Sequence, residues 1–95
     1  MRELILNGLE IGDIASLHTL FARGLDLPAW YGRNLDALYD CLSTYPEPVC
    51  IRLENVDVLM QRLNPRGHAL MRLMHRAAAE NPNIVLAPGE AEAEK

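Results

Sequence analysis

The sequence predicts an α/β domain in which a three-stranded parallel sheet is packed with about four helices. Short runs of apolar and β-branched residues alternate along the chain with longer segments whose apolar residues recur at helical spacing. Turn and capping residues separate these segments. Strands that are separated by helices pair in parallel through crossover connections. The chain of 95 residues has room for one such domain.

The first strand is expected over residues 2–6, because the turn pair at 7–8 (Asn-Gly) ends its apolar run. Asp13 is a suitable N-cap for a helix that runs to about Arg23. Gly24 then suits the end of that helix.

A loop over residues 25–33 follows, and Asn34 is a good N-cap for a second helix that reaches about Ser43. The segment 45–48 (Tyr-Pro-Glu-Pro) cannot continue a helix and is expected to be a loop, because proline removes a backbone donor and restricts the residue before it.

The second half of the chain repeats the alternation. We expect a buried strand over residues 49–53, a short helix over 56–63, the longest helix from 67 to about 80, and a short apolar strand over 84–86. A single domain would then span residues 1–87, and residues 88–95 would form a flexible C-terminal tail.

Charge and composition narrow the classes of function. The net charge of −4 argues against a nucleic-acid binder, which needs a basic surface, and permits a basic protein partner. No apolar run approaches the ~20 residues of a membrane span, and the first residues lack the features of a signal peptide, so we expect a cytoplasmic protein. Cys41 and Cys50 are expected to be buried small hydrophobes and not part of a disulfide framework.

The second helix has two distinct faces. Its core face carries Leu35, Leu38 and Leu42, and a separate face carries Asp36, Tyr39, Asp40 and Ser43. Asp36 lies in the first turn, where the helix dipole favours a negative charge. Asp40 lies past that turn and faces a like charge, at a cost of about 0.2–0.5 kcal/mol.

Two interpretations of this acidic face remain open. Both carboxylates can be simply solvated, because the cost of the pair is small. Alternatively, the face is an interface anchor, since an aromatic residue lies between the two charges and Trp30 and Tyr45 flank the helix in loops. Either of these aromatic side chains can instead be half-buried core.

The run from Leu27 to Leu42, with the sequence Leu-Pro-Ala-Trp-Tyr-Gly-Arg-Asn-Leu-Asp-Ala-Leu-Tyr-Asp-Cys-Leu, resembles the signature segment of the barstar family, intracellular inhibitors of the ribonuclease barnase. The resemblance extends over about residues 2–87. It implies three parallel strands with helices around them, in agreement with the pattern of elements above.

The resemblance also implies a mechanism in which the second helix and the preceding loop enter the active site of a secreted bacterial ribonuclease. The carboxylate at the position of Asp40 would occupy the site of the substrate phosphate, and Asp36 would make a second acidic contact. A basic nuclease bound in a 1:1 complex is the implied partner. The contacts carried over from the family are Trp30, Asn34, Leu35, Asp36, Tyr39, Asp40, Ser43, Tyr45 and Glu80.

Several residues depart from the family pattern. Arg33 and Arg76 stand where the family is acidic, and Tyr39 and Tyr45 stand where it has tryptophans. These changes thin the acidic rim and affect the identity of the target more than the fold. A second hypothesis therefore remains: a barstar-fold interaction or toxin-immunity module whose partner is not a barnase-type ribonuclease.

An enzymatic role finds little support in the sequence. His18, His68 and His75 lack metal-ligand spacing with one another or with the cysteines. Asp36 and Asp40, one turn apart on an exposed helix, have no cleft to separate their pKa values for acid–base work. No glycine-rich phosphate loop is present. We therefore expect no catalytic residue, no metal and no cofactor.

Overall fold

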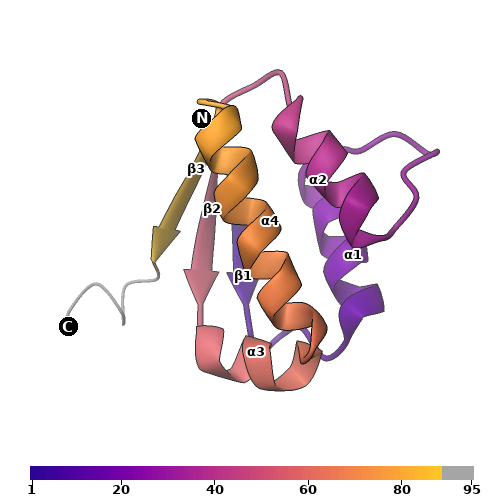
Figure 1. Cartoon of the computed structure of the whole chain (residues 1–95), viewed down its shortest axis with the longest axis vertical. Coiled ribbons are helices and arrows are strands. Elements are labelled where there is room, and N and C mark those ends of the chain that lie inside the picture. Colours follow the sequence, from indigo (N-terminus) through magenta and orange to yellow (C-terminus); the bar gives the residue numbers. More distant parts are fainter. Residues whose placement is uncertain (89–95) are drawn as a thin grey trace.

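A computed structural model describes residues 1–88 and confirms the predicted fold class (Figure 1). Three strands form one parallel sheet in the order β1-β2-β3. The elements, in chain order, are β1 (Arg2–Asn7), α1 (Ile14–Gly24), α2 (Leu35–Ser43), β2 (Val49–Glu54), α3 (Val56–Leu63), α4 (Arg66–Glu80) and β3 (Ile84–Pro88).

Within residues 1–88, helices cover only one face of the sheet, which corrects the expectation of a buried second strand. Along β2, Val49, Ile51 and Leu53 are buried, and the residues between them are only half-buried. On the open face Arg52 Nη2 lies 2.8 Å from Glu3 Oε2, and Val85 of the predicted apolar strand β3 is 41% exposed. Successive residues of a strand point to opposite faces, so a single layer of helices buries alternate residues.

Side-chain caps begin the first two helices where the sequence predicted. Asp13 Oδ1 accepts a hydrogen bond from the Ser16 backbone N–H at 2.8 Å, and Asn34 Oδ1 accepts one from Ala37 at 2.8 Å. Each cap satisfies a backbone donor that the first helical turn leaves without a partner. The start of α2 is thereby fixed at Leu35, which sets the positions of the residues that follow.

The core lies between the helices and the covered face of the sheet. Its largest fully buried side chains include Phe21 of α1, Leu38 and Leu42 of α2, and Leu70 and Met74 of α4. α2 packs against α4, and in Figure 1 α4 lies in front of the sheet with α2 beside it. This packing fixes which side of α2 remains in solvent.

The structure also tests the expected C-terminal boundary of the domain and the expected burial of the two cysteines. Strand β3 continues through Pro88, one residue into the segment expected to be a flexible tail, and residues 89–95 lie outside the described residues. Cys41 and Cys50 are free thiols and are half-buried, so they are less enclosed than expected. Within residues 1–88, no helix is long and apolar enough to cross a membrane.

Candidate partner-binding surface

Helix α2 presents its two aspartates to solvent because its leucines are turned inward. Leu38 and Leu42 are completely buried, whereas Asp36 and Asp40 are exposed. Residues four apart lie on the same side of a helix, so the two carboxylates form one ridge. We call Asp36 and Asp40 the acidic ridge.

Neither carboxylate of the acidic ridge has a side-chain or backbone partner among residues 1–88. Within that range the salt bridges are Arg2–Glu47, Arg52–Glu3 and Arg76–Glu80. The Asp40 backbone carbonyl accepts hydrogen bonds from the Ser43 and Thr44 hydroxyls, at 3.2 and 2.8 Å, but its side chain takes no part. The fold therefore leaves both charges free for a partner.

Trp30 is held out in solvent by the loop that precedes α2. Its side chain is 80% exposed, while the adjacent Tyr31 is buried. The Tyr31 hydroxyl lies 2.6 Å from His18 Nδ1, and the Tyr31 backbone N–H donates to the Pro28 carbonyl at 2.9 Å. Tyr31 thus fixes the loop to α1, so that its neighbour Trp30 faces away from the core.

The His18–Tyr31 pair is part of the scaffold. Burial lowers the pKa of His18, with help from the positive charges of Arg33 and Arg66. Burial also raises the pKa of Tyr31 to about 12. A neutral histidine and a protonated tyrosine can satisfy each other's hydrogen-bonding groups inside the protein.

Arg33 is also used within the fold. Its backbone has a φ of 55°, and its guanidinium donates to Thr19 Oγ1 at 2.6 Å and to the Ala15 carbonyl at 3.2 Å. These bonds tie the end of the loop to α1. The positive charge that departs from the family pattern is therefore directed toward α1.

Tyr39, Arg76 and Glu80 form a polar cluster between α2 and α4. The Tyr39 hydroxyl donates a hydrogen bond to Glu80 Oε1, Arg76 Nε lies 3.4 Å from Glu80 Oε2, and the Arg76 guanidinium lies 5.1 Å from the centre of the Tyr39 ring. The bond from Tyr39 lowers the pKa of Glu80 and raises that of Tyr39. The Glu80 carboxylate thus already has partners within the same molecule, although it is exposed, whereas the carboxylates of the acidic ridge have none in residues 1–88.

Tyr45 points inward. It is 8% exposed, and its hydroxyl donates to the Leu25 carbonyl at 3.0 Å. Its own carbonyl accepts from Asn81 Nδ2 and Asn83 Nδ2, each at 3.0 Å. Asn81 also donates to the Leu42 carbonyl at 2.9 Å, so this buried amide joins the end of α2 to the turn before β3. No pattern near Asn81 in the sequence indicates these distant bonds.

The remaining predicted contacts lie on or beside α2. Asn34 is exposed, although its side chain is occupied by the helix cap, and Leu35 and Ser43 are half-buried. The predicted residues therefore lie on or around one helix, but they differ in whether their side chains already bond to other parts of the fold. Asp36, Asp40 and Trp30 are free, whereas Asn34 and Tyr45 serve the fold.

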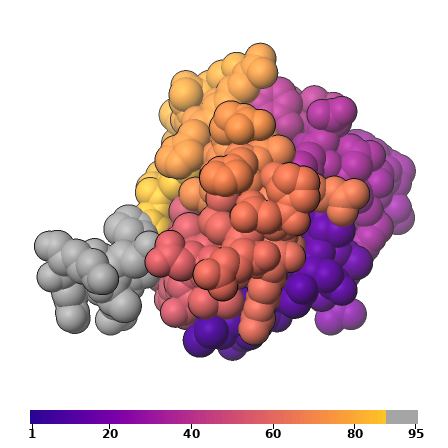
Figure 2. All heavy atoms as spheres, turned by 60° about the horizontal axis from the view of Figure 1, so that its bottom comes forward, coloured from indigo at the N-terminus to yellow at the C-terminus, as the bar shows by residue number. Residues whose placement is uncertain are grey.

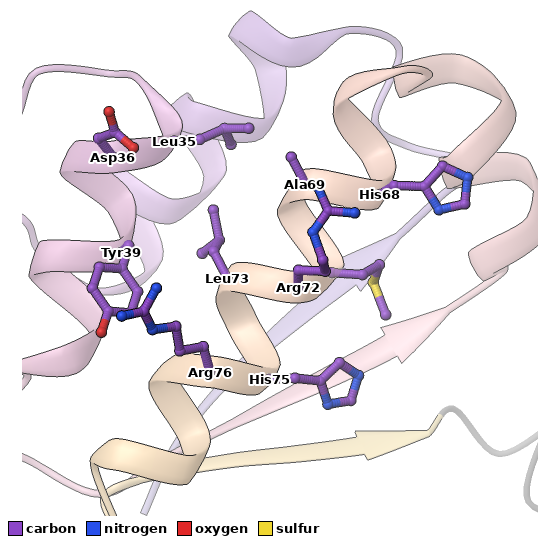
Figure 3. Close-up of a pocket in the computed structure, with 10 residues that line it drawn as sticks. Leu35, Asp36, Tyr39, His68, Ala69, Arg72, Leu73, His75 and Arg76 are labelled. Carbon is purple, nitrogen blue, oxygen red and sulfur yellow. The ribbon is translucent and has the colours of Figure 1, made fainter.

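Two hollows flank the acidic ridge. On one side, a groove of about 660 Å³ between α2 and α4 is lined by Leu35, Asp36, Tyr39 and residues of α4 (Figure 3). On the other, a hollow of about 310 Å³ lies between the loop carrying Trp30 and the loop carrying Tyr45. A charged ridge between two hollows has a shape that can enter a cleft of a partner. Side chains of the partner can then pack into the hollow on each side of the ridge.

The acidic ridge lies on the open surface of α2. Within residues 1–88 there is no group of three or more His, Cys, Asp or Glu side chains placed to hold a metal ion. The two aspartates stand on an exposed helix with no enclosed space between them. The surface is thus an exposed acidic helix flanked by two hollows.

Comparison with known proteins agrees with this geometry. The sequence matches the family described as "Barstar (barnase inhibitor)" over residues 1–87. A Bacillus subtilis (strain 168) protein named "Putative ribonuclease inhibitor YrdF" is 33% identical over 81 residues, which cover 84% of this chain and 89% of that protein. The family match spans all the helices of residues 1–88 and the acidic ridge. The chain belongs to the barstar family.

Proposed function

We propose that this protein inhibits a basic, secreted bacterial ribonuclease by inserting α2 and the preceding loop into the nuclease active site. The observation that carries the proposal is the acidic ridge: two exposed carboxylates that no other group in residues 1–88 compensates. A pair of like charges has no structural benefit at this spacing. Membership of the barstar family and the name of the similar protein support a ribonuclease as the partner.

In the proposed complex the Asp40 carboxylate takes the place of the substrate phosphate. A carboxylate desolvated against guanidinium and imidazolium groups makes short, charge-assisted hydrogen bonds, which are stronger than bonds between neutral groups. Asp36 makes the second acidic contact one turn away. The negative ridge also speeds the encounter with a basic enzyme.

The aromatic residues grip the partner on either side of the ridge. Trp30 offers a large exposed surface on a loop that Tyr31 already holds in place, so binding orders little additional chain. Tyr39 and Leu35 contribute from the groove, and Asn34 and Ser43 from the helix itself. Tyr45, which is buried, shapes the hollow beside Trp30. Glu80 contributes only at the rim, because Tyr39 and Arg76 already bind its carboxylate.

The inhibitor requires no catalytic chemistry of its own. It acts by occupying the active site in a 1:1 complex, and we place this action in the cytoplasm, where the nuclease is made before export. A second candidate is an immunity module for another kind of nuclease toxin. The observation that favours it is the positive charge of Arg72 and Arg76, which line the groove beside Asp36.

An inhibition titration tests the proposal. The wild-type protein is titrated against barnase and several other basic, secreted bacterial ribonucleases, with Asp40→Ala as the matched variant. We expect a 1:1 endpoint for at least one enzyme, and its loss in the folded Asp40→Ala protein. If folded wild-type protein inhibits none of the ribonucleases, the second candidate replaces the first.

A further inference from the structure

The groove between α2 and α4 carries positive charge that phosphate mimicry by Asp40 does not use. Arg72 and Arg76 both line the groove from α4, and Arg76 reaches across it to Tyr39 on α2 (Figure 3). Residues four apart lie on one side of a helix, so the two arginines form a ridge of their own. In the space-filling view, the orange spheres of α4 meet the magenta spheres of α2 directly (Figure 2).

The two arginines differ in how far the fold neutralises them. Arg76 lies 3.4 Å from the Glu80 carboxylate. Arg72 is exposed and has no acidic partner within residues 1–88. Half-buried Leu35 and Leu73 lie beside it in the groove. The groove thus pairs an apolar lining with a free guanidinium, directly next to Asp36 of the acidic ridge.

We propose that this groove binds an acidic segment of the same nuclease, so that the cognate enzyme bears one or more carboxylates beside its basic active site. The inference rests on the proposed function and names the partner's chemistry more closely. A guanidinium pairs with a carboxylate through two parallel hydrogen bonds, and the apolar lining would accept the methylenes of a Glu or Asp side chain. The partner surface would therefore carry both signs of charge, basic against Asp40 and acidic against Arg72.

A phosphate polyanion fits the groove less well than a carboxylate side chain. A nucleic-acid strand lying in the groove would pass Asp36 at its edge and meet the repulsion of a chain with net charge −4. A single carboxylate needs only the space around Arg72. The groove would accordingly select among nucleases, because an enzyme with a cation at this position would face like charges.

A peptide titration tests the ligand class without requiring any nuclease. A capped alanine hexapeptide that carries one central glutamate and a single-stranded DNA hexamer are each titrated into the isotopically labelled protein, and amide shifts are followed by NMR. We expect saturable shifts from the peptide at Arg72, Arg76 and Tyr39. Arg72→Gln should weaken this binding by roughly two- to fivefold, the effect of one exposed ion pair. Arg23→Gln, an exposed arginine of α1, is the matched control.

Three results of this titration would overturn the proposal. They are an absence of saturable shifts in the groove, equal effects of Arg72→Gln and Arg23→Gln, and tighter binding of the DNA hexamer than of the peptide. The last result would assign the groove to nucleic acid. Because all of the residues changed are exposed, the variants should fold as the wild type does.

A second measurement separates this proposal from the proposed function. For any ribonuclease that the wild type inhibits, Arg72→Glu should slow association and weaken inhibition, and Arg23→Glu should do neither. Inhibition unchanged by Arg72→Glu would overturn the groove proposal while the inhibitor function stands. If no ribonuclease is inhibited, the inhibitor function fails and the peptide titration alone decides what the groove binds.

Discussion

The acidic ridge and the polar cluster lie next to each other, yet they differ in whether their carboxylates have bonding partners within the protein. Asp36 and Asp40 have no partner within residues 1–88, whereas Glu80 is bound by Tyr39 and Arg76. All three residues are exposed acids on helices, so exposure alone does not distinguish them. A carboxylate that the fold has already satisfied stabilises the molecule. One that it leaves uncompensated is available to a partner.

The largest expected effect is at the ridge. Asp40→Ala should weaken binding to an inhibited ribonuclease by about 3–5 kcal/mol, because it leaves the enzyme's buried cations without their partner. This is a factor of roughly 10² to 4 × 10³ in the inhibition constant. Glu80→Ala should have a much smaller effect. Equal losses in the two variants would contradict the contrast between ridge and cluster.

The next effect is at the aromatic residues that flank the ridge. Trp30→Ala should weaken binding by about 2 kcal/mol, typical of an exposed aromatic anchor, and change the free energy of unfolding by less than about 0.5 kcal/mol. Tyr45→Phe should affect stability more than binding. It removes the hydrogen bond to the Leu25 carbonyl, so the free energy of unfolding should fall by about 1 kcal/mol with little loss of binding. Urea denaturation and inhibition assays on both variants measure the four quantities, and a Trp30→Ala protein that is strongly destabilised would contradict this assignment.

A smaller effect concerns the scaffold that holds Trp30 in place. The pKa of His18 is lowered in the folded protein, mainly by burial and then by Arg33 and Arg66, so the unfolded chain takes up a proton at a higher pH than the folded one. Stability from this group is complete above the unfolded pKa of about 6.5 and should fall as the pH drops below that value. Urea denaturation at pH values from about 7 to 5 should show the decline, and His18→Asn should flatten it. A slope that is identical in the variant would exclude His18 as its source.

The smallest effect lies inside the polar cluster. The hydrogen bond to Glu80 raises the pKa of Tyr39, so Glu80→Ala should bring that pKa back toward the usual value of about 10. NMR titration of the tyrosine rings resolves Tyr39 from Tyr31 and Tyr45. Asp36→Ala is the control, because Asp36 does not bond to Tyr39. An unchanged pKa of Tyr39 in Glu80→Ala would show that the cluster does not persist in solution.

The sequence predicted the elements well because their signals are local. Asp13 and Asn34 are side-chain caps that act within one turn, and Pro46 and Pro48 exclude a helix wherever they occur. The faces of α2 followed from spacing alone, since inward Leu38 and Leu42 require outward Asp36 and Asp40. Alternation along β2 was equally local, but the apolar bias of the strand masked the half-buried positions of Arg52 and Glu54.

What could not be predicted depends on residues distant in the chain. Nothing near Tyr39 indicates that Glu80 will meet it, and nothing near Asn81 indicates bonds to the end of α2. The inward direction of Tyr45 depends on a carbonyl in the loop before α2. These contacts decide which of the predicted site residues the fold leaves free, and no local pattern in the sequence indicates them.

The most direct test of phosphate mimicry is chemical rescue. Binding of an inhibited ribonuclease is measured for wild type, Asp36→Ala and Asp40→Ala in inorganic phosphate and in chloride of matched ionic strength. If the Asp40 carboxylate occupies the phosphate site, phosphate should compete with wild type and Asp36→Ala, and should partly restore binding of Asp40→Ala by filling the vacated site. Equal weakening of all three proteins by phosphate would contradict the account.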